Sequence, residues 1–125
     1  MVTRRKGSGV AVIFYYAHPV SSYGTKQESR DLQLIASLGL SVYNPNNPED
    51  DAGYRKDGMS HFAMIVKKCD GVVFRAFPDG KIPAGVAFEI SLARESGKPV
   101  IELPTAIIER GLNPEETRER LEAVR

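Results

Sequence analysis

The chain has 125 residues, of which 42% are hydrophobic, and its 17 basic side chains nearly balance 16 acidic ones. This length fits one domain with a single core, and the net charge of +1 gives no support for binding to a nucleic-acid polymer or a membrane surface. The single cysteine, Cys69, excludes an internal disulfide and suits a reducing cytoplasm. Cys69, His18 and His61 lack the spacing of metal ligands, so neither a metal nor another cofactor is expected.

The first predicted strand spans Val10–Tyr16, a continuous run of β-branched and aromatic residues that is typical of a strand buried on both faces. The preceding residues 1–9, which include the basic cluster Thr3–Lys6, are expected to form a frayed, solvated tail. The apolar run is too short to cross a membrane, and no small-residue cleavage site follows it.

A polar loop, residues 18–24, leads to the first predicted helix. Thr25 and Glu28 have the spacing of a capping box, which predicts that the helix begins there. Leucine and isoleucine residues recur at helical spacing along its inner face, and Gly39 is predicted to end it in a left-handed conformation.

The remaining elements are predicted from the same kinds of signal. Residues 40–43 form a short second strand, and the polar segment 49–58 is expected to be irregular. The elements expected after it are a helix over 59–68, a strand over 71–74, a helix that contains Glu89 and ends at Gly97, a strand over 99–103, a turn or short helix at Ile107–Ile108, and a last helix capped by Asn113.

This alternation of strands and helices predicts one three-layer α/β domain, residues 1–125, with a parallel sheet joined by right-handed crossovers. The economical arrangement is a flavodoxin-like (Rossmann-like) sheet of four to five strands, with an order beginning 2-1-3-4. Ligands of such sheets bind beyond the carboxyl ends of the strands, where the winding reverses. That point lies between the first and third strands, so residues 18–24 and 75–85 are expected to form a crevice.

Glu89 is the most informative residue of this crevice. It follows a Pro- and Gly-containing loop by about a turn and a half of helix, and Val86, Ile90 and Ala93 form the core stripe around it. A carboxylate in this setting is partly desolvated, which is costly unless a partner or a ligand compensates. The alternative is a glutamate at the rim, paired with an arginine or a backbone donor.

Two other groups of residues are candidates for binding. Ser21, Ser22 and Gly24 precede a helix N-terminus, which suits a phosphate or another anion, although the serines could equally satisfy local backbone groups. Tyr15 and Tyr16 end the first strand with opposite facings, so one of them is able to stack on a base in the crevice or to pack in the core.

His61, on the second helix, is a candidate for acid–base chemistry, and a half-buried structural histidine is the alternative. Asp70, before the third strand, is a candidate binding residue whose expected role is to cap the junction between helix and strand. The chain contains neither a P-loop nor a Gly-x-Gly-x-x-Gly pattern, so a nucleoside triphosphate or dinucleotide in its usual cradle is unsupported. A desolvated glutamate beside an anion-binding loop and an aromatic residue fits attack on the anomeric carbon of a nucleoside or nucleotide.

Two stretches, Cys69–Phe74 and Gly85–Ile90, together with Gly97–Ile101, resemble the nucleoside 2-deoxyribosyltransferase family, including its nucleotide N-glycosidase branch. The resemblance covers residues 10–103. It implies that Glu89 is the nucleophile, that Tyr15 or Tyr16 is the aromatic end of the first strand, and that residues 18–24, with His18, bind sugar or phosphate. Gly85 matches the small residue that opens the Glu89 helix.

Two positions depart from the pattern of that family. The catalytic aspartate expected about eight residues before Asp70 is Phe62, for which His61 and Asp57 are the nearest substitutes. A second aspartate expected about six residues before Glu89 is Pro83, with Asp79 further up the loop.

The predicted function is hydrolysis of an N-glycosidic bond, or deoxyribosyl transfer, on a nucleoside or nucleoside monophosphate. The alternatives are a non-catalytic nucleotide-binding or sensing module, and a glycohydrolase acting on NAD-like dinucleotides. The family is typically oligomeric, and the apolar pair Ile107–Ile108 with the last amphipathic helix leaves surface to cover. A homodimer or a higher homo-oligomer in the cytoplasm is therefore expected.

Overall fold

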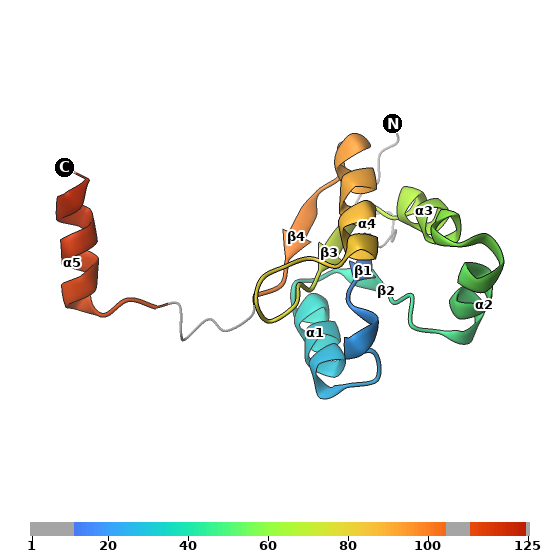
Figure 1. The fold of residues 1–125 in the computed structure, drawn as a ribbon, viewed down its shortest axis with the longest axis horizontal. Helices are drawn as coiled ribbons and strands as arrows, with labels where there is room; N and C mark the ends of the chain where they lie inside the picture. Colours follow the sequence, from blue (N-terminus) through green and yellow to red (C-terminus); the bar gives the residue numbers. More distant parts are fainter. Residues whose placement is uncertain (1–11, 105–110, 125) are drawn as a thin grey trace.

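The fold was obtained as a computed structural model that describes residues 12–104 and 111–124. It contains a four-stranded sheet in the order β2-β1-β3-β4, and every pair of neighbouring strands is parallel (Figure 1). The strands are β1 (Ile13–Ala17), β2 (Ser41–Tyr43), β3 (Gly71–Phe74) and β4 (Val100–Glu102). The predicted α/β fold and its strand order 2-1-3-4 are confirmed.

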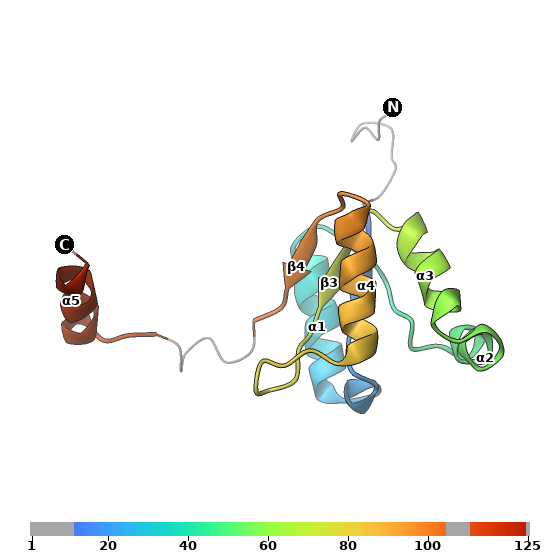
Figure 2. The ribbon, with the colours of Figure 1, turned by 45° about the horizontal axis from the view of Figure 1, so that its top comes forward.

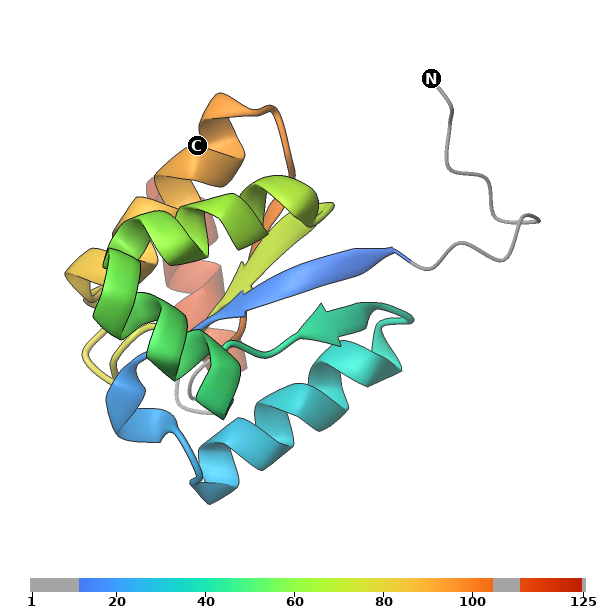
Figure 3. The same cartoon turned by 90° about the vertical axis from the view of Figure 1, so that its right-hand side faces the viewer.

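Helices cover both faces of the sheet. The helices of the described residues are α1 (Lys26–Ser37), α2 (Pro48–Asp57), α3 (Met59–Lys68), α4 (Ala84–Glu95) and α5 (Pro114–Ala123), with a short 3-10 turn at Val20–Ser22. Figure 3 shows α1 on one face of the sheet, and α3 and α4 on the other. Figure 2 shows α5 apart from these layers, and none of the residues of α5 is buried.

The two faces of β1 carry two separate cores. Tyr15 and Ala17 pack with residues of α3 and α4, whereas Phe14 and Tyr16 pack with Ile35 of α1. This alternation explains why a strand covered on both sides reads as a continuous apolar run. The core stripe of α4 is confirmed, since Val86, Ile90 and Ala93 are all buried.

The start of the first strand differs from the prediction. Among the described residues the strand begins at Ile13, and both Val12 and Ile13 are exposed. These two residues lie at the amino end of the strand, where neither helical layer covers them. Residues 10 and 11 lie outside the described part of the chain, as does the expected turn at Ile107–Ile108.

Segment 49–58 was expected to be irregular, and this prediction is wrong because most of it belongs to α2. The Asn47 side chain accepts a hydrogen bond from the backbone N–H of Asp50, and Pro48 follows the cap. Acidic residues fill the first turn and two basic residues the last, as the helix dipole favours. The helix is polar on most of its surface, so its sequence shows no apolar periodicity from which a helix could be predicted. The same Asn-Pro-acid signal did identify α5, where Asn113 forms a full capping box with Glu116.

The predicted ends of α1 are confirmed in part. The Thr25 hydroxyl accepts a hydrogen bond from the backbone N–H of Glu28, and Gly39 has a φ of 82°. The reciprocal half of the capping box is replaced by another contact, because the Glu28 carboxylate accepts a hydrogen bond from the N–H of Gly24.

No helix within residues 12–104 or 111–124 is long and apolar enough to span a bilayer.

Candidate functional site

A cavity of about 760 Å³ lies beyond the carboxyl ends of the strands, at the predicted switch point between β1 and β3. Its walls come from the loop after β1, the segment between β2 and α2, the helices α2 and α3, and the start of α4. The lining residues are Tyr15, His18, Pro19, Val20, Tyr23, Pro45, Asn46, Asn47, Pro48, Asp51, Tyr54, Met59, Phe62, Pro83, Gly85, Val86 and Glu89. The loop 75–85 therefore contributes less than expected, and the segment after β2 contributes more.

Glu89 lines this cavity and is only 6% exposed. Its Oε2 accepts a 2.5 Å hydrogen bond from the Tyr15 hydroxyl. Burial raises the pKa of Glu89 to about 7, and the hydrogen bond from Tyr15 acts in the opposite direction. At neutral pH the carboxyl group is thus poised between its protonated and ionised forms, which is common for groups that take part in catalysis.

Tyr15 is itself held in place from the neighbouring strand. Its ring stacks on Tyr43 of β2 with the ring centroids 6.1 Å apart and the planes within 8° of each other. The Tyr43 hydroxyl donates a 2.6 Å hydrogen bond to Asp50, which is 3% exposed. Desolvation is the main cause that raises the pKa of Tyr15, followed by the neighbouring Glu89, so Tyr15 remains a hydrogen-bond donor.

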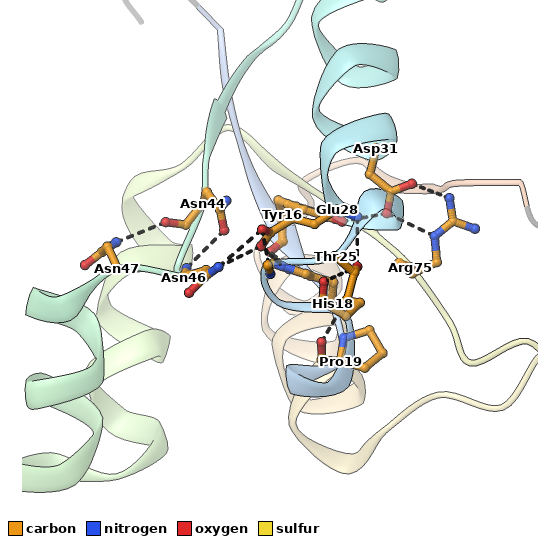
Figure 4. Close-up of polar contacts among 12 residues, drawn as sticks. Tyr16, His18, Pro19, Thr25, Glu28, Asp31, Asn44, Asn46, Asn47 and Arg75 are labelled. Carbon is orange, nitrogen blue, oxygen red and sulfur yellow. Dashed lines mark hydrogen bonds and ion pairs between the residues drawn. The ribbon is translucent and has the colours of Figure 1, made fainter.

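Glu28 of α1 is not among the described residues that line the cavity, but it contacts two that are, His18 and Asn46 (Figure 4). Oε2 of Glu28 lies 2.9 Å from His18 Nε2, and the side-chain amide of Asn46 donates to both carboxylate oxygens at 3.0 and 3.2 Å. The N–H of Gly24 donates to Oε1 at 3.0 Å. These donors, His18 first among them, hold the pKa of Glu28 below its usual value even though burial opposes this.

His18 has both of its ring nitrogens engaged. Nδ1 lies 3.0 Å from the carbonyl oxygen of Tyr16, and Nε2 faces Glu28. The ring stacks on Tyr16 with 3.6 Å between centroids and approaches Tyr23 at 4.6 Å. Burial lowers the pKa of His18, whereas the bonds to Glu28 and the Tyr16 carbonyl raise it. His18 therefore contributes the surface of its ring to the cavity wall, and both of its ring nitrogens are already engaged by protein groups.

Tyr16 does not line the cavity. It points to the other face of the sheet, where its hydroxyl donates a 2.5 Å hydrogen bond to Asp31 of α1. Asp31 also accepts from Nε of Arg75 at 3.0 Å (Figure 4), and Arg75 donates to the carbonyl oxygen of Pro104. The two tyrosines thus face opposite ways as expected, and it is Tyr15 that reaches the crevice.

His61 is likewise turned away from the cavity. Its Nε2 lies 2.7 Å from Oδ1 of the buried Asp50, and its ring packs so closely on α2 that a Cβ atom at Gly53 would approach within 2.3 Å of it. Asp50 therefore joins α2, α3 and, through Tyr43, the strand that supports Tyr15. This arrangement matches the structural alternative for His61.

The other candidates lie outside the cavity lining. Ser21 is exposed, the Ser22 hydroxyl donates to the carbonyl of Pro19, and Asp79 is exposed and accepts from the N–H of Lys81. Asp70 accepts from the N–H of Ile13 at 2.8 Å, which places it at the amino end of β1, opposite to the cavity. This contact ties the start of β3 to the start of β1.

The structure therefore brings together four of the candidates, Glu89, Tyr15, His18 and Gly85. Sequence reasoning missed the contribution of the segment between β2 and α2, which supplies Asn46 and Asn47, and that of α2, which supplies Asp51. The Asn-Pro pairs of this segment were a usable signal, because they mark a helix start next to the end of a strand. Among the described residues, no group of three potential metal ligands is found.

A comparison with protein-family models and with curated protein sequences gives no match to this chain. The likeness to nucleoside 2-deoxyribosyltransferases accordingly bears on function only as part of a proposal.

Proposed function

We propose that the protein cleaves or exchanges the N-glycosidic bond of a nucleoside or nucleoside monophosphate, with Glu89 as the nucleophile. The observation that carries this proposal is the buried, hydrogen-bonded pair of Glu89 and Tyr15 in the wall of the cavity. A buried glutamate without a cationic partner is costly to a fold. Its position at a cavity wall makes a functional role the better explanation of that cost.

The chemistry follows from the geometry of this pair. An ionised Glu89 oxygen attacks the anomeric carbon, the bond from that carbon to the base nitrogen breaks, and the electron pair leaves with the base, which takes up a proton from water. The product is a glycosyl ester on Glu89. Water then attacks the same carbon and releases the sugar and the carboxylate, while a second base in place of water completes a transfer. The Tyr15 hydroxyl stabilises the ionised form of Glu89 and orients its oxygen.

The walls of the cavity suit the two parts of a nucleoside. Tyr23, Tyr54 and Phe62 supply aromatic surface on which a base is able to stack. Asn46 and Asp51 supply polar groups for sugar hydroxyls. The observed mixture of aromatic surface and a few polar groups is typical of small-molecule sites.

One observation favours a second candidate, a nucleotide-binding or sensing module without catalysis. Phe62 lines the cavity at the position where the resemblance predicts a catalytic aspartate, and neither His61 nor Asp57 is among the described residues that line it. Asp51 is the one other carboxyl group among the described lining residues. If protonation of the base by water does not suffice for its departure, the cavity binds without turnover.

The test is a screen of nucleosides, 2′-deoxynucleosides, nucleoside monophosphates and NAD, in which both free-base release and binding are measured. Release from a nucleoside or a monophosphate supports the proposed activity. Binding without release over long incubations supports the sensing module, and release of nicotinamide from NAD alone supports the NAD-type glycohydrolase. Absence of both binding and release across the panel contradicts the proposal.

A further inference from the structure

Three hydrogen-bond donors of the kind that hold a phosphate converge on the carboxylate of Glu28, in the first turn of α1. The Glu28 carboxylate accepts hydrogen bonds from the N–H of Gly24, from the side-chain amide of Asn46 and from a ring nitrogen of His18. The Glu28 side chain is only 10% exposed. Donors converging on a buried carboxylate at a helix start form an anion site that the protein fills with its own anion.

The charges near the cavity act in the same direction, because burial lowers the pKa of His18, the one described lining side chain that ionises to a cation. None of the described residues that line it is a lysine or an arginine, and two of them, Asp51 and Glu89, carry carboxyl groups. Arg55 lies close to Asp51, but it pairs with that carboxylate at 3.0 Å and its side chain is 78% exposed. Arg75 is engaged by Asp31 on the other face of the sheet. Burial raises the pKa of Tyr23 to about 12, and the neighbouring carboxylates of Glu89 and Glu28 raise it further.

We infer that Glu28 is a specificity-determining residue, whose carboxylate takes the place of a substrate phosphate and so selects nucleosides that lack a phosphate group. This inference rests on the proposed function and narrows its substrate class. A 5′-phosphate placed near His18 and Asn46 finds their donors occupied and meets a like charge behind them, which is a repulsive element of the kind that creates specificity. An uncharged sugar hydroxyl meets no such repulsion.

The test uses two variants of Glu28 and a matched control. Glu28→Gln keeps the size of the side chain and removes its charge, and Glu28→Ala also releases the donors of Gly24 and Asn46. Asp31→Asn is the control, since it removes another buried carboxylate from the next turn of α1, on the side away from the cavity. Thermal melts establish a temperature at which all four proteins are folded, and calorimetry then measures the affinities for adenosine, 2′-deoxyadenosine and their 5′-monophosphates.

The wild-type protein should bind the nucleosides more tightly than the monophosphates. Both Glu28 variants should shift this ratio toward the monophosphate by about tenfold or more, as expected when a like-charge contact is removed, whereas Asp31→Asn should keep the wild-type ratio. A wild-type preference for monophosphates, or an unchanged ratio in both Glu28 variants, overturns the inference.

A second measurement separates this inference from the proposed function. Inorganic phosphate is titrated while the backbone amide signal of Gly24 and the side-chain amide signals of Asn46 are followed by NMR. The wild-type signals should stay in place, and those of Glu28→Ala should move. If no nucleoside or monophosphate binds but phosphate moves the signals in Glu28→Ala alone, the proposed function fails and the role of Glu28 as a built-in anion stands. Phosphate-dependent movement in the wild-type protein contradicts that role.

Discussion

The Tyr15 hydroxyl and the Glu89 carboxylate lie 74 positions apart in the chain and form a 2.5 Å hydrogen bond at the wall of the cavity. The bond joins the central strand β1 to the helix α4 at the point where the sheet reverses its winding. It also supplies Glu89 with the partner that a buried carboxyl group requires. Burial raises the pKa of Glu89 and this hydrogen bond lowers it, and the pH dependence of both activity and stability follows from that pKa.

Tyr15→Phe should move the pH dependence of base release to higher pH. The hydrogen bond from Tyr15 lowers the pKa of Glu89, so its loss leaves burial unopposed and raises the pKa above its present value of about 7. The ionised nucleophile accumulates as pH rises through this pKa, and the rising limb of kcat/KM should shift upward by about one pH unit. Tyr16→Phe, which changes the neighbouring tyrosine on the other face, should leave the limb in place. If the rising limb of kcat/KM does not move in Tyr15→Phe, the hydrogen bond from Tyr15 does not set the pKa of Glu89.

Glu89→Gln should stabilise the fold at alkaline pH. The pKa of Glu89 is raised from 4.5 to about 7, so between these values the folded protein holds a proton that the unfolded chain releases, and stability falls as pH rises. The side-chain amide of the variant is neutral at every pH, so the variant does not lose stability through ionisation at this position. Urea denaturation should show the variant to be more stable by roughly 2–3 kcal/mol at pH 8 and nearly equal to the wild type at pH 4.5. Equal stability at pH 8 would mean that Glu89 ionises in the folded protein as easily as in water.

The buried ion pair of Asp31 and Arg75 should matter far more for stability than the exposed pair of Asp51 and Arg55. Asp31→Ala leaves a guanidinium group that is 8% exposed without its carboxylate, at an expected cost of about 3–5 kcal/mol. The side chains of Asp51 and Arg55 are 61% and 78% exposed, and Asp51→Ala should change stability by about 0.5 kcal/mol or less. Chemical denaturation of the two variants provides the comparison, and similar losses would contradict it.

We expect the protein to be a homodimer or a dimer-based oligomer. Leu121 and Val124, in and just after α5, are 62% and 80% exposed, and Met64 of α3 is 51% exposed. Apolar side chains in these positions are available for burial against a second copy of the chain. Light scattering at micromolar concentration should give at least twice the monomer mass, and a monomer mass would refute the expectation.

The fold could be predicted from the sequence because its signals are local and mutually consistent. The apolar run of β1, the stripe of α4 and the caps at Thr25 and Asn113 each specify an element, and the alternation of elements then limits the topology. The helix α2 was missed because its stability depends on capping and charge rather than on an apolar face. The exposure of Val12 and Ile13 was missed because their residue types do not show where the covering helices end.

The site was predictable only in part, for a different physical reason. Glu89 was found because a carboxylate within an apolar helical stripe conflicts with its surroundings, and such conflicts mark functional residues. The contacts between Glu28, His18 and Asn46 join three separate segments, and no local pattern encodes them. Glu28 was recognised for its spacing from Thr25, yet the tertiary fold directs its carboxylate to the cavity wall instead of to the backbone of Thr25.

The most direct test of the account is the rate of base release by Glu89→Gln, measured with the best substrate of the wild-type protein and compared with Glu95→Gln. Glu95 is an exposed glutamate at the end of the same helix, so its variant controls for the substitution itself. Glu89→Gln should stay folded and bind the nucleoside while release falls by several orders of magnitude, as expected when a covalent step is lost. Glu95→Gln should keep the wild-type rate. Release by Glu89→Gln at nearly the wild-type rate would contradict the central claim that Glu89 is the nucleophile.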